Sequence, residues 1–126
     1  MTATGKRILV VEDDEVNLMI AEHILGRAGF TVSTVNNGEE AIEIVAKEQF
    51  DLILMDIEMP IMDGVEATPI IRQSDNGAQI PIIALTAHSM QEKLDEFKAA
   101  GMNDYIIKPF DGTKFQEIVD KYLPQS

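Results

Sequence analysis

Residues 51–64 read DLILMDIEMPIMDG, and this stretch determines how the chain is expected to fold. Its apolar run, Leu52–Met55, has the length and continuity of a strand that is buried on both faces of a parallel sheet. Asp56 follows the run directly, and a turn-rich stretch, Glu58–Gly64, leads into a helix. A buried strand that ends in a carboxylate and turns toward a helix is one βα unit.

Four further segments have the character of strands, and a helical pattern follows each one. The strands are predicted at Arg7–Val11, Thr31–Val35, Ile82–Leu85 and Tyr105–Ile107. Five successive βα units predict an α/β fold of the (βα)5 type, a doubly wound parallel sheet with helices on both faces. For five strands in one domain spanning residues 1–126, the flavodoxin-like strand order 2-1-3-4-5 fits better than the longer dinucleotide-binding order.

Helix ends and faces can also be placed from the sequence. The first helix is predicted at about residues 15–28, with Val16, Ile20 and Ile24 at helical spacing and Gly29 at its C-terminal end. Helix starts are predicted from a capping box of Asn37 with Glu40, a second one of Ser89 with Glu92, and an N-cap at Asp111. The fourth helix should end at Gly101, and the last helix carries an apolar stripe of Phe115, Ile118, Val119 and Tyr122.

Pro69 lies inside the third helical pattern, where a proline costs about 3 kcal/mol or more. The helix is expected either to kink at Pro69 or to begin there, with Thr68 as its N-cap. We favour the kink, because Asp63-Gly64 already has the character of a helix start.

Composition narrows the class of protein. The 126 residues are 45% hydrophobic, which is enough for a core, and the formal net charge is -12. Such a charge repels nucleic acid phosphates and favours cations and basic protein surfaces. The absence of cysteine excludes disulfides and thiol catalysis and agrees with a cytoplasmic location. We expect no membrane insertion and no signal peptide, because the apolar runs are short and the first six residues are polar.

The reactive side chains follow the predicted strands at their carboxyl ends, where open α/β sheets bind ligands. Glu12, Asp13 and Asp14 follow the first strand, Asp56 the third, Thr86 the fourth and Lys108 the fifth. The fifth strand would lie two spacings from the third, about 10 Å away, so that only a long side chain such as lysine could reach Asp56. Converging carboxylates repel one another unless they bind a cation, and oxygen ligands of this kind suit Mg²⁺. A phosphoryl group on Asp56 would then be neutralised by the metal, Lys108 and Thr86.

Four stretches, VVEDD, LILMDIEMPIMDG, PIIALTA and YIIKPF, resemble the signature regions of response-regulator receiver domains in their order and spacing. The resemblance implies that Asp56 is the phosphoacceptor, that Asp13, Asp56 and the backbone carbonyl of Glu58 bind Mg²⁺, and that Glu12 acts mostly through water. It also implies that Thr86 is the switch hydroxyl, Tyr105 the switch aromatic and Lys108 the phosphate-binding lysine. By the same resemblance the Lys108–Pro109 bond is expected to be cis, and Glu58 and His88 are expected to set the lifetime of the phosphoryl group. Asp14 receives no ligand role, and His23 is expected at the surface or boundary of the first helix.

The resemblance further implies a signalling function in a two-component system or phosphorelay. A histidine kinase or histidine phosphotransfer domain would donate the phosphoryl group, and a downstream protein would bind the face formed by the fourth helix, fifth strand and fifth helix. The domain would catalyse only its own phosphorylation and dephosphorylation, either as a stand-alone regulator or as the receiver of a hybrid histidine kinase.

Three other classes of protein can be compared with this pattern of residues. An FMN-binding flavodoxin needs a neutral phosphate loop where this chain has EDDEVN. A phosphatase of the haloacid-dehalogenase kind needs a second aspartate at the position of Glu58. A receiver-like interaction module that is not regulated by phosphorylation remains the alternative.

Overall fold

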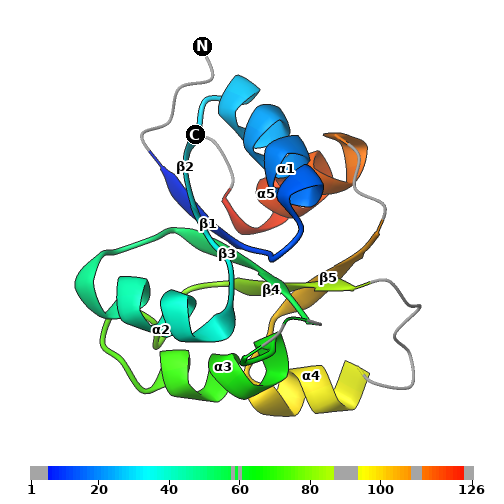
Figure 1. The fold of residues 1–126 in the computed structure, drawn as a ribbon. Helices are drawn as coiled ribbons and strands as arrows, with labels where there is room; N and C mark the ends of the chain where they lie inside the picture. The colour runs from blue at the N-terminus through cyan, green and yellow to red at the C-terminus, as the bar shows by residue number, and fades with distance from the viewer. Residues whose placement is uncertain (1–5, 58, 60, 87–93, 109–111, 124–126) are drawn as a thin grey trace.

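The computed structural model describes residues 6–57, 59, 61–86, 94–108 and 112–123, and these form the predicted α/β fold (Figure 1). The strands are β1 (Arg7–Val11), β2 (Thr31–Val35), β3 (Leu52–Asp56), β4 (Ile82–Thr86) and β5 (Asp104–Ile107). The helices are α1 (Glu15–Arg27), α2 (Gly38–Lys47), α3 (Gly64–Arg72), α4 (Leu94–Ala100) and α5 (Gly112–Tyr122). All neighbouring strands are parallel, and their order is β2-β1-β3-β4-β5, which confirms the predicted topology.

The sheet separates two hydrophobic cores. On one face α1 and α5 cover the sheet, and on the other face α2, α3 and α4 do so (Figure 1). The first core packs α1 and α5 through Leu25, Phe115 and Val119, while the second packs the other three helices through Val45, Ile71 and Phe97. Because β1, β3 and β4 are covered on both faces, their apolar residues are continuous rather than alternating, as the sequence indicated.

The predicted glycine ends of α1 and α4 are confirmed. Gly29 and Gly101 have φ angles of 99° and 111°, a left-handed conformation that glycine adopts without steric cost. At the N-terminus of α2, Asn37 accepts a hydrogen bond from the N–H of Glu40, but the Glu40 carboxylate bonds to the N–H of Asn36, one residue before the cap. The predicted capping box is therefore displaced by one residue, which the long Glu40 side chain can span. The predicted caps at Ser89, Glu92 and Asp111 lie outside the described residues.

Helix α3 begins at Asp63 and continues through Pro69. Asp63 and Glu66 form a reciprocal capping box, with Asp63 Oδ1 2.8 Å from the N–H of Glu66. The alternative start at Thr68 is wrong, because Thr68 is buried inside the helix and its hydroxyl donates to the carbonyl of Gly64 at 2.7 Å. The kink at Pro69 stays a prediction.

Of the three residues that spacing suggested for one side of helix α1, Ile24 packs half-buried against the first core, but Val16 and Ile20 are exposed. Leu18, Ala21 and Leu25 are the buried residues of this helix. Val16 is 62% exposed and Ile20 37% exposed, and Met19 between them is 67% exposed. Helix α1 is apolar on two sides, so periodicity did not distinguish the inner side from the outer one. We refer to Val16, Met19 and Ile20 as the α1 strip.

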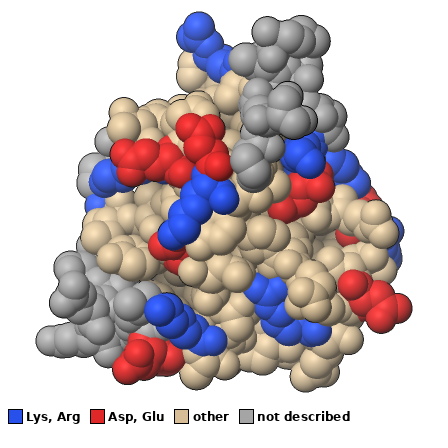
Figure 2. All heavy atoms as spheres, turned by 180° about the vertical axis from the view of Figure 1, so that it is seen from behind, with Lys and Arg blue, Asp and Glu red and all other residues tan. Residues whose placement is uncertain are grey.

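Figure 2 shows charged side chains of both signs beside broad areas of uncharged residues. On the described part of the face seen in Figure 2, Lys and Arg side chains lie among Asp and Glu side chains rather than in one basic patch. Among the described residues, each helix is too short or too polar to cross a membrane. The mixed charges and the net charge of -12 do not favour direct binding of nucleic acid.

Candidate functional site

Strand register brings the predicted site residues to one edge of the sheet. Val11 pairs with Met55, so Glu12 and Asp56 follow neighbouring positions on β1 and β3. Thr86 pairs with Ile107 on β5, so Lys108 lies one residue beyond the end of the pairing. The backbone N–H of Lys108 donates to the Thr86 carbonyl at 2.7 Å, which anchors the lysine to the end of β4.

Three carboxylates meet at this edge. Glu12, Asp13 and Asp56 each offer an oxygen, and these oxygens lie within 4.8 Å of one another. Glu12 and Asp56 are 1% and 2% exposed, whereas Asp13 is exposed to solvent. Like charges this close repel by about 3–4 kcal/mol per pair at an effective dielectric constant near 20. The cluster therefore requires compensating positive charge.

Lys108 supplies one positive charge. Its Nζ lies 3.1 Å from Glu12 Oε2 and 3.3 Å from Asp56 Oδ2, so the side chain bridges the two buried carboxylates. Burial lowers the pKa of Lys108, but the charges of Asp56 and Glu12 outweigh it and raise this pKa above its ordinary value. The ammonium is therefore protonated throughout the physiological range, and three carboxylates face a single cation among the described residues.

The two oxygens of Glu12 have different surroundings. Oε1 accepts hydrogen bonds from Asn17 Nδ2 at 3.3 Å, from the N–H of Asp14 at 3.4 Å and from Lys108 at 3.4 Å. Oε2 is buried and contacts Lys108 as an ion pair without hydrogen-bond geometry, so it is a buried acceptor without a hydrogen-bond donor. A buried carboxylate oxygen of this kind, next to two further carboxylates, fits a hard divalent cation or its bound water.

Thr86 and Tyr105 lie on the same face of the sheet. Tyr105 pairs with Ala84, and Thr86 is two residues further along β4, so both side chains point toward the α3 and α4 side. Thr86 is 3% exposed and Tyr105 is half-buried. The two predicted switch residues are therefore on neighbouring strands and on one face, as a coupled movement would require.

Asp14 lies beside the cluster but has a different role. It is the N-cap of α1, where its Oδ1 accepts from the N–H of Val16 at 2.8 Å and of Asn17 at 3.4 Å. This agrees with its having no ligand role. His23 is exposed on α1, as expected. Glu58, His88 and Pro109 lie outside the described residues, and so do the predictions that rest on them.

Two residues of the site were not found from the sequence. Asn17 contacts Glu12, and its place in the first turn of the helix that follows the acids was the only clue. Gly64 lies against β3, since a Cβ at this position would be 2.5 Å from the carbonyl oxygen of Asp56. Only glycine allows α3 to start this close to β3, and Gly64 thereby fixes the position of the Asp56 backbone.

Comparison with known proteins points to one family. The family model for the response regulator receiver domain matches residues 8–120. Transcription factor SKN7 of Saccharomyces cerevisiae is 41% identical over 119 residues, which cover 94% of this chain but 19% of SKN7. The chain thus spans less than one fifth of the length of this curated relative.

Solved structures of receiver domains agree with the fold. The receiver domain of sensor histidine kinase PA1611 from Pseudomonas aeruginosa, which has a magnesium ion in its active site cleft, matches with a TM-score of 0.88 and 39% identity, covering 97% of this chain and all of that one. A co-crystal structure of the Saccharomyces cerevisiae phosphotransfer protein Ypd1 with the receiver domain of Ssk1 matches with a TM-score of 0.86 and 26% identity, covering 97% of this chain and 91% of that one.

Proposed function

Because this chain belongs to the response regulator receiver family, we propose that it accepts a phosphoryl group from a phosphohistidine onto Asp56 and then controls a partner protein. One observation carries the proposal. The buried Asp56 carboxylate lies beside two further carboxylates and 3.3 Å from the Lys108 ammonium. A carboxylate nucleophile that forms an aspartyl phosphate is established chemistry, and this surrounding suits it.

The site fits Mg²⁺. Asp13 and Asp56 would hold the ion directly and Glu12 mostly through water, and the backbone carbonyl of Glu58 is the further ligand expected from the sequence. The buried Oε2 of Glu12 supports this assignment, and so does the magnesium found in the PA1611 receiver. When bound, the ion neutralises charge on the phosphoryl oxygens.

Asp56, Lys108 and Thr86 would have separate roles in the transfer of the phosphoryl group. An oxygen of Asp56 attacks phosphorus, so that a P–O bond forms while the P–N bond to the donor imidazole breaks. Lys108 already contacts Asp56 and would donate to a phosphoryl oxygen, while the Thr86 hydroxyl would donate to another. Under this proposal the domain catalyses only its own phosphorylation and dephosphorylation. Glu58 and His88 would set the rate of the second step.

The donor would be a histidine kinase or a histidine phosphotransfer domain. Its imidazole must reach Asp56, so its surface must contact the rim of the site. The exposed α1 strip, which is 37–67% exposed, lies on the helix that begins directly after the acids of the site. We assign the strip to this contact, and the pairing of Ypd1 with the Ssk1 receiver supports a donor of this kind.

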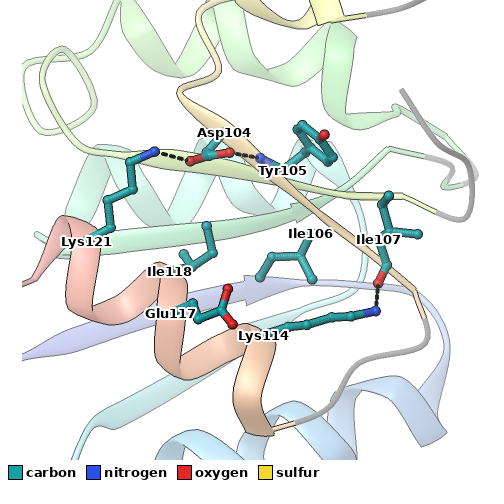
Figure 3. A pocket seen from close by; sticks show the side chains of 8 residues that line it. All are labelled: Asp104, Tyr105, Ile106, Ile107, Lys114, Glu117, Ile118 and Lys121. Atoms are coloured by element: carbon teal, nitrogen blue, oxygen red, sulfur yellow. Dashed lines mark hydrogen bonds and ion pairs between the residues drawn. The ribbon is translucent and has the colours of Figure 1, made fainter. Parts of the chain in front are cut away.

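The output face would be formed by α4, β5 and α5. A pocket of about 490 Å³ opens there between β5 and one side of α5 (Figure 3), lined by Asp104, Tyr105, Ile106, Ile107, Lys114, Glu117, Ile118 and Lys121. Movement of Thr86 toward a phosphoryl group would vacate space for Tyr105, which lies on β5, the strand that borders this pocket, although its ring points to the other face of the sheet (Figure 3). A change at the site could therefore alter the surface that a downstream protein binds.

The cytoplasmic location and the choice between a stand-alone regulator and a hybrid-kinase receiver remain part of the proposal. The absence of cysteine agrees with a reducing compartment.

The test is intact-mass measurement after incubation with acetyl phosphate, with and without Mg²⁺, on the wild type and on Asp56→Asn. We expect one phosphoryl adduct that requires Mg²⁺ and disappears in the variant. Absence of an adduct, both with acetyl phosphate and with phosphorylated histidine kinases, would favour the alternative, an interaction module that phosphorylation does not regulate.

A further inference from the structure

The carboxylate of Glu12 is held asymmetrically, and the asymmetry comes from a residue outside the acidic cluster. Asn17 Nδ2 lies 3.3 Å from Glu12 Oε1, whereas Oε2 has no hydrogen-bond donor. The Lys108 ammonium lies 3.1 Å from Oε2 and 3.4 Å from Oε1, and it also contacts Asp56 Oδ2 at 3.3 Å. Hydrogen bonds from Asn17 and from the N–H of Asp14 thus hold Oε1, whereas Oε2 contacts Lys108 as an ion pair and accepts no hydrogen bond.

Asn17 is itself held in place. It is the third residue of α1, and its backbone N–H donates to the N-cap Asp14 at 3.4 Å. Asn17 is half-buried, while its neighbour Val16 is exposed. The carboxamide therefore projects from a fixed point of the first helical turn toward Glu12, and it does not depend on a flexible loop.

From this geometry we infer that Asn17 is a positioning residue for the metal site, which holds Glu12 so that Oε2 remains directed at the cation. The inference rests on the Mg²⁺ binding proposed above and adds a residue to it.

A neutral donor suits this role for an electrostatic reason. A lysine or arginine here would compensate the charge of Glu12 and reduce the attraction for a divalent cation, and an aspartate would repel Glu12. A carboxamide orients the carboxylate by a hydrogen bond and leaves its charge intact. Partners of this kind commonly change metal affinity by about 10- to 100-fold when they are removed.

The experiment is a double-mutant cycle on Mg²⁺ affinity, measured by titration calorimetry of the unphosphorylated protein with MgCl₂. The variants are Asn17→Leu, Glu12→Gln and the double variant. We expect Asn17→Leu to weaken Mg²⁺ binding by about tenfold. In the Glu12→Gln background the same change should alter the dissociation constant by less than about twofold, because the residue through which Asn17 acts has been altered.

A control separates positioning from general stability. Gln79→Leu also replaces a carboxamide with leucine, here an exposed one away from the site, and should leave Mg²⁺ affinity unchanged. Urea unfolding without Mg²⁺ shows whether Asn17→Leu is folded, and the affinity comparison uses only folded protein.

Three results would overturn the inference: no Mg²⁺ binding by the wild type, no loss of affinity in folded Asn17→Leu, or an equal loss in both backgrounds. The proposed function fails differently, through the absence of an acetyl phosphate adduct on a wild type that does bind Mg²⁺. At saturating Mg²⁺, Asn17→Leu should still form the adduct, since Asp56 and Lys108 are intact.

Discussion

Lys108 compensates the charge of two buried carboxylates, so removing its charge should lower the free energy of unfolding. Its Nζ lies 3.1 Å from Glu12 Oε2 and 3.3 Å from Asp56 Oδ2. The substitution Lys108→Met keeps most of the length of the side chain and removes the charge. We expect the variant to be strongly destabilised in the absence of metal, because Glu12 and Asp56 would remain buried and facing each other.

The magnitude follows from the distances. At an effective dielectric constant near 20, each contact attracts by about 5 kcal/mol, and the cost of burying the charges offsets much of this sum. Removing one partner of a buried ion pair typically costs about 3–5 kcal/mol. The Lys108 side chain is 21% exposed, and solvent screening puts the expected loss at the lower end, about 3 kcal/mol.

Mg²⁺ should reverse most of this loss. A divalent cation supplies the positive charge that the variant lacks, and it binds the folded state alone, so it stabilises that state by mass action. The measurement is urea unfolding of the wild type and Lys108→Met, without Mg²⁺ and across a Mg²⁺ series. We expect the stability difference between them to shrink as Mg²⁺ rises, because in the wild type the cation must share the carboxylates with an ammonium.

Lys121→Met is the matched control. Lys121 pairs with Asp104 at 3.0 Å, a distance similar to those of Lys108, but its side chain is 65% exposed. Pairs of this kind contribute little, so this variant should unfold nearly like the wild type at all Mg²⁺ concentrations. The reasoning is refuted if Lys108→Met behaves like Lys121→Met, or if its deficit does not respond to Mg²⁺.

Three further predictions test other parts of the structure. Gly64→Ala should lower the free energy of unfolding by about 1–3 kcal/mol and slow acetyl phosphate labelling, because its Cβ would lie 2.5 Å from the Asp56 carbonyl oxygen. Ile61→Gly should raise the free energy of unfolding by about 1 kcal/mol in a thermal unfolding experiment, because Ile61 is a β-branched residue with φ of 71° and is 73% exposed. A lower free energy of unfolding would show that the Ile61 side chain makes stabilising contacts. Burial raises the pKa of Asp104, but hydrogen bonds, chiefly from Lys121, outweigh it and lower this pKa. The stability that Asp104 contributes should therefore be present above about pH 4 and lost as pH falls through the folded-state pKa, and Asp104→Asn should flatten acid unfolding curves over that range.

The sequence predicted the sheet well because its strands are buried on both faces. Continuous apolar runs such as Leu52–Met55 are buried on both faces, which places them in the centre of a parallel sheet. The side of helix α1 that faces the core was harder to predict from the sequence. The helix carries apolar residues on two sides, and only the packed structure shows that Leu25 faces the core while Met19 faces solvent. An outward apolar strip has the same periodicity as an inward one, so no analysis of spacing could separate them.

The site was predictable where it depended on topology and not where it depended on side-chain direction. Strand order alone places the residues that follow β1, β3, β4 and β5 at one edge, and Glu12, Asp56 and Lys108 do meet there. Asn17 and Gly64 act through a single hydrogen bond and a single close approach, and neither leaves a periodic pattern. Their roles emerge only once α1 and α3 have fixed positions relative to the strands.

The charges of the site explain why phosphorylation should move the chain. Among the residues that the structure describes, three carboxylates lie against the Lys108 ammonium with two negative charges in excess, and a divalent cation would balance them. A phosphoryl group then adds negative charge at Asp56, so Lys108 is drawn away from Glu12 and toward the phosphoryl oxygens. The backbone N–H of Lys108 is bonded to the Thr86 carbonyl at 2.7 Å, so this shift pulls on the ends of β4 and β5 together. The Lys108 contact that compensates the carboxylates before phosphorylation thus connects the charge of the site to the face of the sheet on which Tyr105 lies.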